Sequence, residues 1–293
     1  MRYGLFGSLS IVIAMSLLTI HRKSELETWT NALFEQTSER SEQSHPFQQH
    51  QTCCPIVELR QYTTYPGQRD TLMDLFDREF VESQEAVSMT IIGQFRDLDK
   101  PDRFVWLRGF RDMPSRGQAL KGFYYGPVWQ AHRGEANPTM IDATNVLLLR
   151  PVSRLSGFSL NIKDRPKLAA SEVSKGLVIA TVYYFHTPVS ADFIDFFEHT
   201  IKPVVTRSGA SILAYFVTES SANNFPALPI RENEHVLVWF MGFPDQAAYE
   251  RHTLALSRSR RWRSEIAGEL ARRLKGTPEV LRLQPTARSL LHG

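Results

Sequence analysis

The sequence predicts an α+β fold built from two tandem ferredoxin-like units, each with the order β-α-β-β-α-β. Three observations predict it. Strand-like and helix-like patterns alternate from residue 56 onward, their order is the same in both halves of the chain, and several landmark residues recur at one fixed spacing. The chain has 293 residues, which is enough for two domains with sizeable cores.

The first unit contains four segments that alternate as strands do, residues 56–65, 88–97, 103–110 and 145–152. After the first of these, apolar residues follow helical spacing from Leu72 to Phe80, with Glu79 as the one polar member. A second helical pattern covers residues 115–135. These segments give the predicted order of the first unit, residues 53–152.

The second unit, residues 177–287, repeats that order. Its predicted strands are residues 177–185, 211–218, 235–243 and 279–286. Apolar residues from Phe193 to Ile201 predict its first helix, and residues 257–275 predict its second. A polar linker, residues 153–176, separates the units, and extra length in the second unit falls in a Pro-bearing loop at about residues 220–232.

Landmark residues indicate that the second unit is a duplicate of the first. The first unit contains two Trp, a Gly-Phe pair and an Asp, namely Trp106, Gly109, Phe110, Asp112 and Trp129. The same residue types occur 133 positions later, at Trp239, Gly242, Phe243, Asp245 and Trp262. Agreement of five residues at a single offset is improbable by chance, so we interpret the chain as a tandem duplication.

The N-terminal residues 1–52 differ in composition from the rest. Residues 3–20 are mostly apolar, near the length of a membrane span, and His21, Arg22 and Lys23 follow them. As an anchor, this segment would keep the following chain in the cytoplasm; an over-extended gene start is the alternative. Residues 24–51 predict a disordered linker. We therefore expect a cytoplasmic protein, either free or tethered to the membrane by residues 3–20.

Composition and motifs narrow the classes of function. A net charge of +3 is too small to indicate nucleic-acid binding. The two cysteines, Cys53 and Cys54, are adjacent, so we expect no disulfide framework and a reducing compartment. The histidines lack metal-ligand spacing and the chain lacks a Gly-rich phosphate loop, so we expect no metal and no cofactor.

The first predicted strand raises the main question about a site. Glu58, Arg60 and Tyr62 share one of its faces, while Val57 and Leu59 occupy the other. The third strand places Phe104, Trp106, Arg108 and Phe110 on the same kind of face. We expect this face to meet the sheet of the second unit and to line a cavity between the two sheets. A structural Arg60–Glu58 pair, buried in a dry seam, is the alternative.

Two other clusters have competing interpretations. Tyr125, Trp129 and His132 lie within about two turns of the second helix, where they either pack on the sheet or form a site with His132 as acid or base. The basic segment from Arg258 to Lys275 would suit nucleic acid or anionic lipid, but interleaved Glu residues favour a solvated helix face.

The pattern E-L-R-x-Y-x-x-x-P-G from Glu58 to Gly67, with the later strands of the first unit, resembles the NIPSNAP family of the dimeric α/β-barrel superfamily. The resemblance covers residues 55–152 well and the second unit weakly. It implies ferredoxin-like units whose antiparallel sheets pack face to face as a barrel, with helices outside. It implies no settled reaction; relatives in the superfamily include cofactor-free monooxygenases, isomerases and haem-handling proteins, and a shared fold does not transmit chemistry.

Three functions follow as hypotheses. The first is a NIPSNAP-type protein that binds a small molecule or a partner through the inter-sheet cavity. The alternative is a cofactor-free monooxygenase or isomerase that acts on a small organic substrate there, and the third is a membrane-tethered adaptor. Monomer and homodimer both remain open. The catalytic residues are unknown, and the candidate pocket residues are Glu58, Arg60, Tyr62, Trp106, Arg108, Tyr125, Trp129 and His132.

Overall fold

The structure, a computed structural model, describes residues 52–168 and 174–293. The apolar segment 3–20 and the expected linker at 24–51 lie outside the described residues, so the membrane tether stays a prediction. Among the helices within the described ranges, none has the length and apolar character needed to cross a membrane.

The first half of the described chain contains all four predicted strands and one more. Its elements are β1 (Ile56–Thr64), α2 (Arg69–Leu75), the π-helical η1 (Phe76–Phe80), α3 (Val81–Glu85), β2 (Thr90–Asp97), β3 (Arg103–Phe110), α4 (Met113–Tyr124), α5 (Pro127–Ala136), η2 (Asn137–Thr139), β4 (Met140–Asp142) and β5 (Val146–Pro151). The helix predicted at 115–135 is two helices, because Gly126 starts α5 in extended conformation and packs where a side chain would meet the carbonyl of Gly122.

The second half has the same order of strands and helical segments, without a counterpart of β4. After the short η3 (Ile162–Asp164) come β6 (Leu177–Phe185), α6 (Ala191–Phe196), η4 (Phe197–Ile201), α7 (Lys202–Arg207), β7 (Ser211–Thr218), β8 (His235–Phe243), α8 (Gln246–Arg258), η5 (Trp262–Ile266), α9 (Ala267–Arg273) and β9 (Glu279–Pro285). The prediction missed α8, which begins where Asp245 accepts a capping hydrogen bond from the Ala248 backbone, 2.7 Å away.

Eight antiparallel strands close one barrel. In the first half the pairing order is β5-β1-β3-β2, and in the second half it is β9-β6-β8-β7. Strand β2 then pairs with β9 and β5 pairs with β7, so the two arrays join at both edges. Closure leaves these strands without free edges, and the short β4 adds to β1 beside the barrel.

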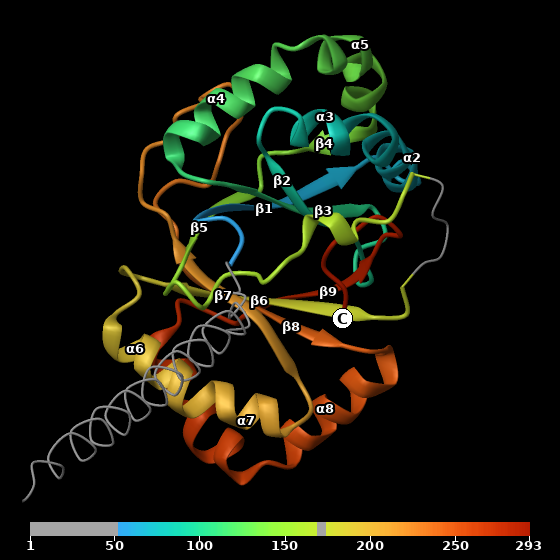
Figure 1. Cartoon of the computed structure of the whole chain (residues 1–293). Helices are drawn as coiled ribbons and strands as arrows, with labels where there is room; N and C mark the ends of the chain where they lie inside the picture. The colour runs from blue at the N-terminus through green and yellow to red at the C-terminus, as the bar shows by residue number, and fades with distance from the viewer. Residues whose placement is uncertain (1–51, 169–173) are drawn as a thin grey trace, which may run out of the picture. The chain divides into compact units, whose positions relative to one another are not determined.

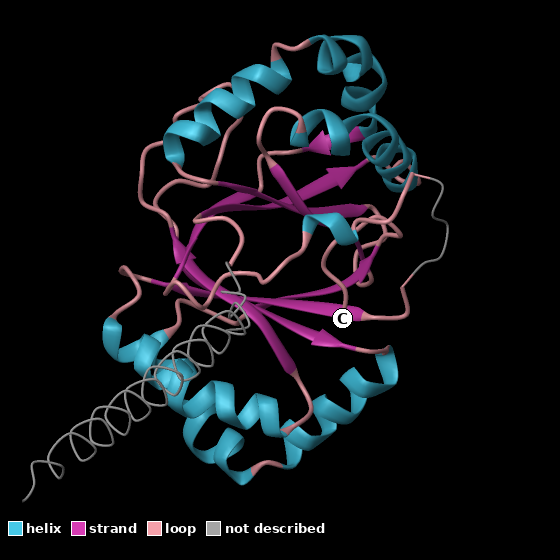
Figure 2. Cartoon of the chain, in the orientation of Figure 1, coloured by secondary structure: helices cyan, strands magenta, loops and turns pink. Residues whose placement is uncertain are grey.

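The barrel interior is an apolar core to which both halves contribute. Val57 and Leu59 from β1 lie there with Val178 and Ala180 from β6, all almost fully buried. An eight-stranded barrel has room inside for side chains and little else. Figure 1 shows α2 to α5 outside the strands on one side and α6 to α8 on the other, and Figure 2 shows the strands between these two helix layers.

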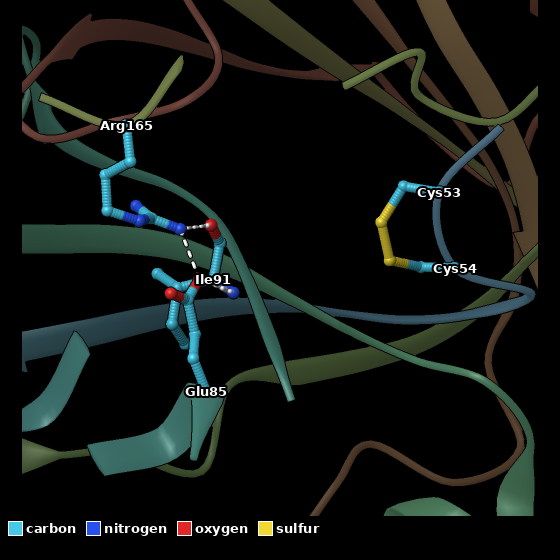
Figure 3. The surroundings of a disulfide bond; sticks show 5 residues. All are labelled: Cys53, Cys54, Glu85, Ile91 and Arg165. Carbon is cyan, nitrogen blue, oxygen red and sulfur yellow. Dashed lines mark hydrogen bonds and ion pairs between the residues drawn. A yellow bond between two sulfur atoms is a disulfide. The ribbon is translucent and has the colours of Figure 1, made fainter. Parts of the chain in front are cut away.

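The segment between the halves contributes to this core, which its polar composition did not predict. Phe158 is fully buried and packs against Phe216 and Phe240, with ring centroids 5.1 and 5.0 Å away. Further along, Arg165 donates to Glu85 Oε1 at 2.5 Å and to the carbonyl of Ile91 at 2.6 Å, as Figure 3 shows. The segment is therefore anchored to the first half as well as to the barrel.

The expectation that the adjacent cysteines form no disulfide is wrong. Cys53 and Cys54 are bonded to each other just before β1 (Figure 3). Cys54 has a φ of 67°, and a side chain at Gly109 would collide with its sulfur. The eight-membered ring therefore packs closely on β3, at one end of the barrel core.

Candidate functional site

The face of β1 that carries Glu58, Arg60 and Tyr62 lies beneath the helices of the first half. This corrects the sequence-based expectation that the face meets the sheet of the second half. Tyr62 and Trp106 pack in a cluster with Phe76 and Phe80 of η1, whereas Val57 belongs to the barrel core. The prediction exchanged the two faces of β1. Both halves share the barrel interior, and the wholly apolar face lies there.

A single buried carboxylate accepts from three buried guanidinium groups. Glu58 Oε2 lies 2.5 Å from Arg60 Nη1 and 2.8 Å from Arg108 Nε, and Glu58 Oε1 lies 2.7 Å from Arg116 Nε. All four side chains are fully buried. We call Glu58, Arg60, Arg108 and Arg116 the arginine cluster. Arg60 and Glu58 form the ion pair that the sequence analysis gave as the alternative interpretation of their shared face.

The arginine cluster carries an excess of positive charge. One carboxylate faces three guanidinium groups, so two of the three positive charges are not neutralised within it. Burial by itself would raise the pKa of Glu58, but Arg108, Arg60 and Arg116 together hold it well below its usual range. Glu58 is therefore ionised, and removing its charge would leave three buried cations together.

Neutral groups complete the surroundings of the arginines. Arg60 Nε donates to the Tyr62 hydroxyl at 2.8 Å, and Arg108 Nη1 donates to Gln84 Oε1 at 3.1 Å and to the Tyr124 hydroxyl at 3.4 Å. The guanidinium carbons of Arg60 and Arg108 lie 5.4 and 5.1 Å from the centre of the Trp106 ring, which suits cation–π attraction.

Beside the arginine cluster lies a cavity of about 120 Å³ between β1, β3 and the helices of the first half. Tyr62, Gln84, Trp106 and Tyr124 line it, and each of them also contacts an arginine of the cluster. The remaining lining residues are almost all apolar or aromatic, namely Leu72, Phe76, Phe80, Phe104, Phe123, Trp129, Ala136, Asn137, Met140, Ala143 and Leu228. We call this space the aromatic cavity.

A loop of the second half closes over this region. Asn223 and Asn224 accept from Arg116 Nη1 at 3.1 and 2.6 Å, and Phe225 stacks on Tyr124 with ring centroids 5.8 Å apart. Leu228 belongs to the wall of the aromatic cavity. The extra length at residues 220–232, noted in the sequence, thus contributes to the surroundings of the site in the other half.

The eight sequence-predicted residues divide into three groups. Glu58, Arg60 and Arg108 belong to the arginine cluster, and Tyr62, Trp106 and Trp129 line the aromatic cavity. The other two predicted residues lie elsewhere. The Tyr125 side chain is 67% exposed, and His132 lies outside the cavity wall, where it faces Glu79 and Glu135 at 3.4 and 3.0 Å.

Sequence reasoning missed Arg116, Gln84 and the loop residues. Arg116 lies on the buried face of α4 with Ala119, Leu120 and Phe123, spaced three, four and seven residues later. That spacing was a readable signal of a buried arginine. Nothing comparable marked Asn223 and Asn224, because they reach the cluster across more than 100 positions of sequence.

A second, larger hollow of about 570 Å³ lies where β5 meets β7 and is bordered by the loops of the second half. Two of its charged groups form an ion pair, Arg231 Nη2 with Glu234 Oε1 at 2.5 Å. Arg150 and Glu232 on its rim are exposed. The aromatic cavity is smaller but combines burial with unneutralised charge, so it is the stronger candidate site.

The histidines, cysteines and carboxylates do not form a metal site within residues 52–168 and 174–293. In these ranges, groups of three or more such side chains placed to hold an ion are absent.

Comparison with known proteins finds similarity in solved structures alone. No family model matches the chain, and no curated protein matches it. A protein of Fusobacterium nucleatum subsp. nucleatum, proposed to be a monooxygenase, is 11% identical, with 82% of this chain and 96% of that chain covered and a TM-score of 0.49. A protein of Lactobacillus acidophilus NCFM with the same proposed activity is 13% identical over 79% of this chain and 94% of that one, with a TM-score of 0.45.

A solved structure of a NIPSNAP-domain protein is also similar to part of this chain. An uncharacterised NIPSNAP-domain protein from Burkholderia xenovorans is 17% identical over 33% of this chain and 95% of that chain, with a TM-score of 0.31. Identities this low concern the fold, and they transfer no chemistry to this chain.

Proposed function

We propose that the first half of the chain binds a small, mostly apolar organic molecule in the aromatic cavity. The observation that carries the proposal is an aromatic cavity, lined mostly by buried side chains, directly beside unneutralised arginine charge. A cavity of about 120 Å³ is of the size that accepts one aromatic ring, since an engineered apolar cavity of roughly 150 Å³ binds benzene.

The fold itself does not require the charges. In β1, Glu58 pairs with Arg108 and Arg60 with Trp106, and the same places in β6 are Ile179 with Met241 and Thr181 with Trp239. Arg116, four residues after the capping Asp112, corresponds to Tyr249, four after the capping Asp245. The four counterparts of the arginine cluster are uncharged, namely Ile179, Thr181, Met241 and Tyr249.

Buried ion pairs are often no more stabilising than well-packed apolar residues of similar volume. Because the second half builds the same arrangement without them, a functional role explains the arginine cluster better than stability does. This supports binding in the first half. The cofactor-free monooxygenase or isomerase stays a prediction, as does a homodimer.

We also propose that the halves, residues 53–152 and 177–287, are tandem ferredoxin-like units that arose by duplication. The shared pairing order and the two Asp-capped helices α4 and α8 support this interpretation. One copy would then have kept or acquired the charged site, while the other supplies barrel strands and the covering loop.

Titration of the full-length chain with toluene tests the binding proposal. Binding to the native state alone raises the melting temperature, by several degrees when ligand is far above its Kd. Ala143→Trp fills the cavity and should abolish the shift, whereas Ala255→Trp on the exposed face of α8 should retain it. A toluene shift that survives Ala143→Trp would show that the cavity is not the site.

A further inference from the structure

Two tyrosine hydroxyls in the wall of the aromatic cavity each accept a hydrogen bond, and their O–H protons are available to donate. Tyr62 accepts from Arg60 Nε at 2.8 Å, and Tyr124 accepts from Arg108 Nη1 at 3.4 Å. A hydroxyl that accepts one hydrogen bond still has its own O–H to donate. Among the described residues, neither O–H has a protein acceptor.

A third donor lies in the same wall. The Trp106 indole Nε1 is buried without a partner among the described residues, and indole nitrogen only donates. Gln84, in contrast, is already used on both sides: its oxygen accepts from Arg108 and its nitrogen donates to the carbonyl of Phe80 at 2.9 Å. Three of the polar groups that line the cavity are therefore donors with nothing to donate to.

Positive charge stands behind these donors. Arg60 and Arg116 each keep one buried nitrogen, Nη2, without a partner among the described residues. Unsatisfied buried polar groups are uncommon in native proteins; Trp106 Nε1 belongs to the cavity wall, and Arg60 and Arg116 are residues of the neighbouring arginine cluster. Donors polarised by adjacent cations favour an acceptor that carries negative charge.

We propose that the ligand of the aromatic cavity carries an anionic oxygen, which accepts from the hydroxyls of Tyr62 and Tyr124 while its ring packs on the aromatic wall. This inference rests on the proposed function and names the class of ligand: a compound of about one ring with a carboxylate or a phenolate. The arginines act through the tyrosines, since each of the two hydroxyls accepts from one of them.

The state of Tyr62 fits this role. Burial raises the pKa of Tyr62 to about 12, with Arg60 opposing and Tyr124 adding to the rise. The phenol therefore keeps its proton at neutral pH and donates it.

The test titrates the full-length chain with benzoate, with its neutral isostere benzamide and with toluene, by calorimetry at neutral pH. We expect benzoate to bind at least tenfold more tightly than benzamide, the value of one or more hydrogen bonds to a charged group. 4-Cyanophenol is titrated below and above its pKa, so that binding of the neutral phenol is compared with binding of the phenolate. This comparison tests a phenolate separately from the carboxylate of benzoate. A preference for either anion supports the inference.

Hydroxyl-deleting variants locate the anion. Tyr62→Phe and Tyr124→Phe should each weaken benzoate about tenfold while leaving toluene unchanged. Tyr183→Phe is the matched control, because Tyr183 occupies the place of Tyr62 in β6 and should leave both ligands unaffected. Circular dichroism confirms that each variant is folded.

The outcomes separate the inference from the proposed function. Toluene that binds with neither anion preferred overturns the anionic oxygen and leaves the cavity as a binding site. An anion preference that survives both Phe variants overturns the role of the two hydroxyls. If toluene and all the oxygen-bearing probes fail to bind, the proposed function fails and the inference fails with it.

Discussion

Arg116 on α4 donates its Nε to Oε1 of Glu58 on β1 at 2.7 Å, and both side chains are fully buried. This pair ties a helix to the sheet across 58 positions of sequence. It also uses the Glu58 oxygen that Arg60 and Arg108 leave free, so one carboxylate holds three arginines in place.

Glu58→Gln should therefore be strongly destabilising. The substitution keeps the shape of the side chain but leaves three buried guanidinium groups without a counter-charge, at a cost of about 3–5 kcal/mol. Chemical denaturation measures this as a lower midpoint. Glu79→Gln, on a partly exposed glutamate of η1, is the control and should change stability little. A Glu58→Gln protein as stable as the control would show that the carboxylate is not what balances the arginines.

Replacing the whole arginine cluster should be far milder than breaking it. The changes are Glu58→Ile, Arg60→Thr, Arg108→Met and Arg116→Tyr, which install the residues of the second half. We expect stability within about 2 kcal/mol of the unmodified chain, because apolar packing often matches a buried ion network. Benzoate binding should be lost. If this variant unfolds while Glu58→Gln survives, the cluster is a structural element of the first half.

Gly117 on α4 leaves room for the loop that covers the site. A Cβ at Gly117 would lie 2.8 Å from Asn224 Nδ2, and that amide is held by Arg116 Nη1 at 2.6 Å and the Met113 carbonyl at 2.5 Å. In a free helix Gly→Ala stabilises by about 1 kcal/mol. Here the clash should cancel that gain, so Gly117→Ala should be neutral or destabilising.

A double-mutant cycle isolates this contact. In the Asn224→Ala background the obstruction is gone, and Gly117→Ala should then stabilise the protein by about 0.5–1 kcal/mol. Ser220→Ala, in the same loop, is the control background and should leave the effect of Gly117→Ala unchanged. Equal effects of Gly117→Ala in the Asn224→Ala and Ser220→Ala backgrounds would mean that the loop does not press on α4.

The sequence predicted the strands well and the environment of their faces poorly. The spacing of Glu58 and Arg60 correctly predicted their pairing, because residues two apart on a strand share a face. The spacing did not indicate which face the helices cover, because the alternation of side chains along a strand is the same whichever face is covered. Both faces of β1 are buried, one in the barrel and one under the helices.

The rest of the site depends on contacts that local patterns do not encode. Asn223 and Asn224 come from a loop of the other half, and Tyr124 acquires its role only when β3 brings Arg108 beneath it. The break at Gly126, which turns one predicted helix into two, is likewise set by close packing against Gly122. Residue spacing therefore located most of the arginine cluster but not the cavity beside it.

Asp77 on η1 gives a pH dependence that is independent of the site. Burial raises the pKa of Asp77 to about 6, with Arg288 opposing the rise and Asp74 adding to it. The unfolded chain releases this proton near pH 4. Between about pH 4 and 6 the native state thus binds more protons than the unfolded state, so this group makes stability fall as pH rises through that range.

Asp77→Asn should remove this fall in stability and raise stability at pH 7 by about 1–3 kcal/mol, whereas exposed Glu250→Gln should not. Urea denaturation at a series of pH values measures the difference; a wild-type curve that stays parallel to that of Asp77→Asn from pH 4 to 7 would mean that Asp77 titrates normally.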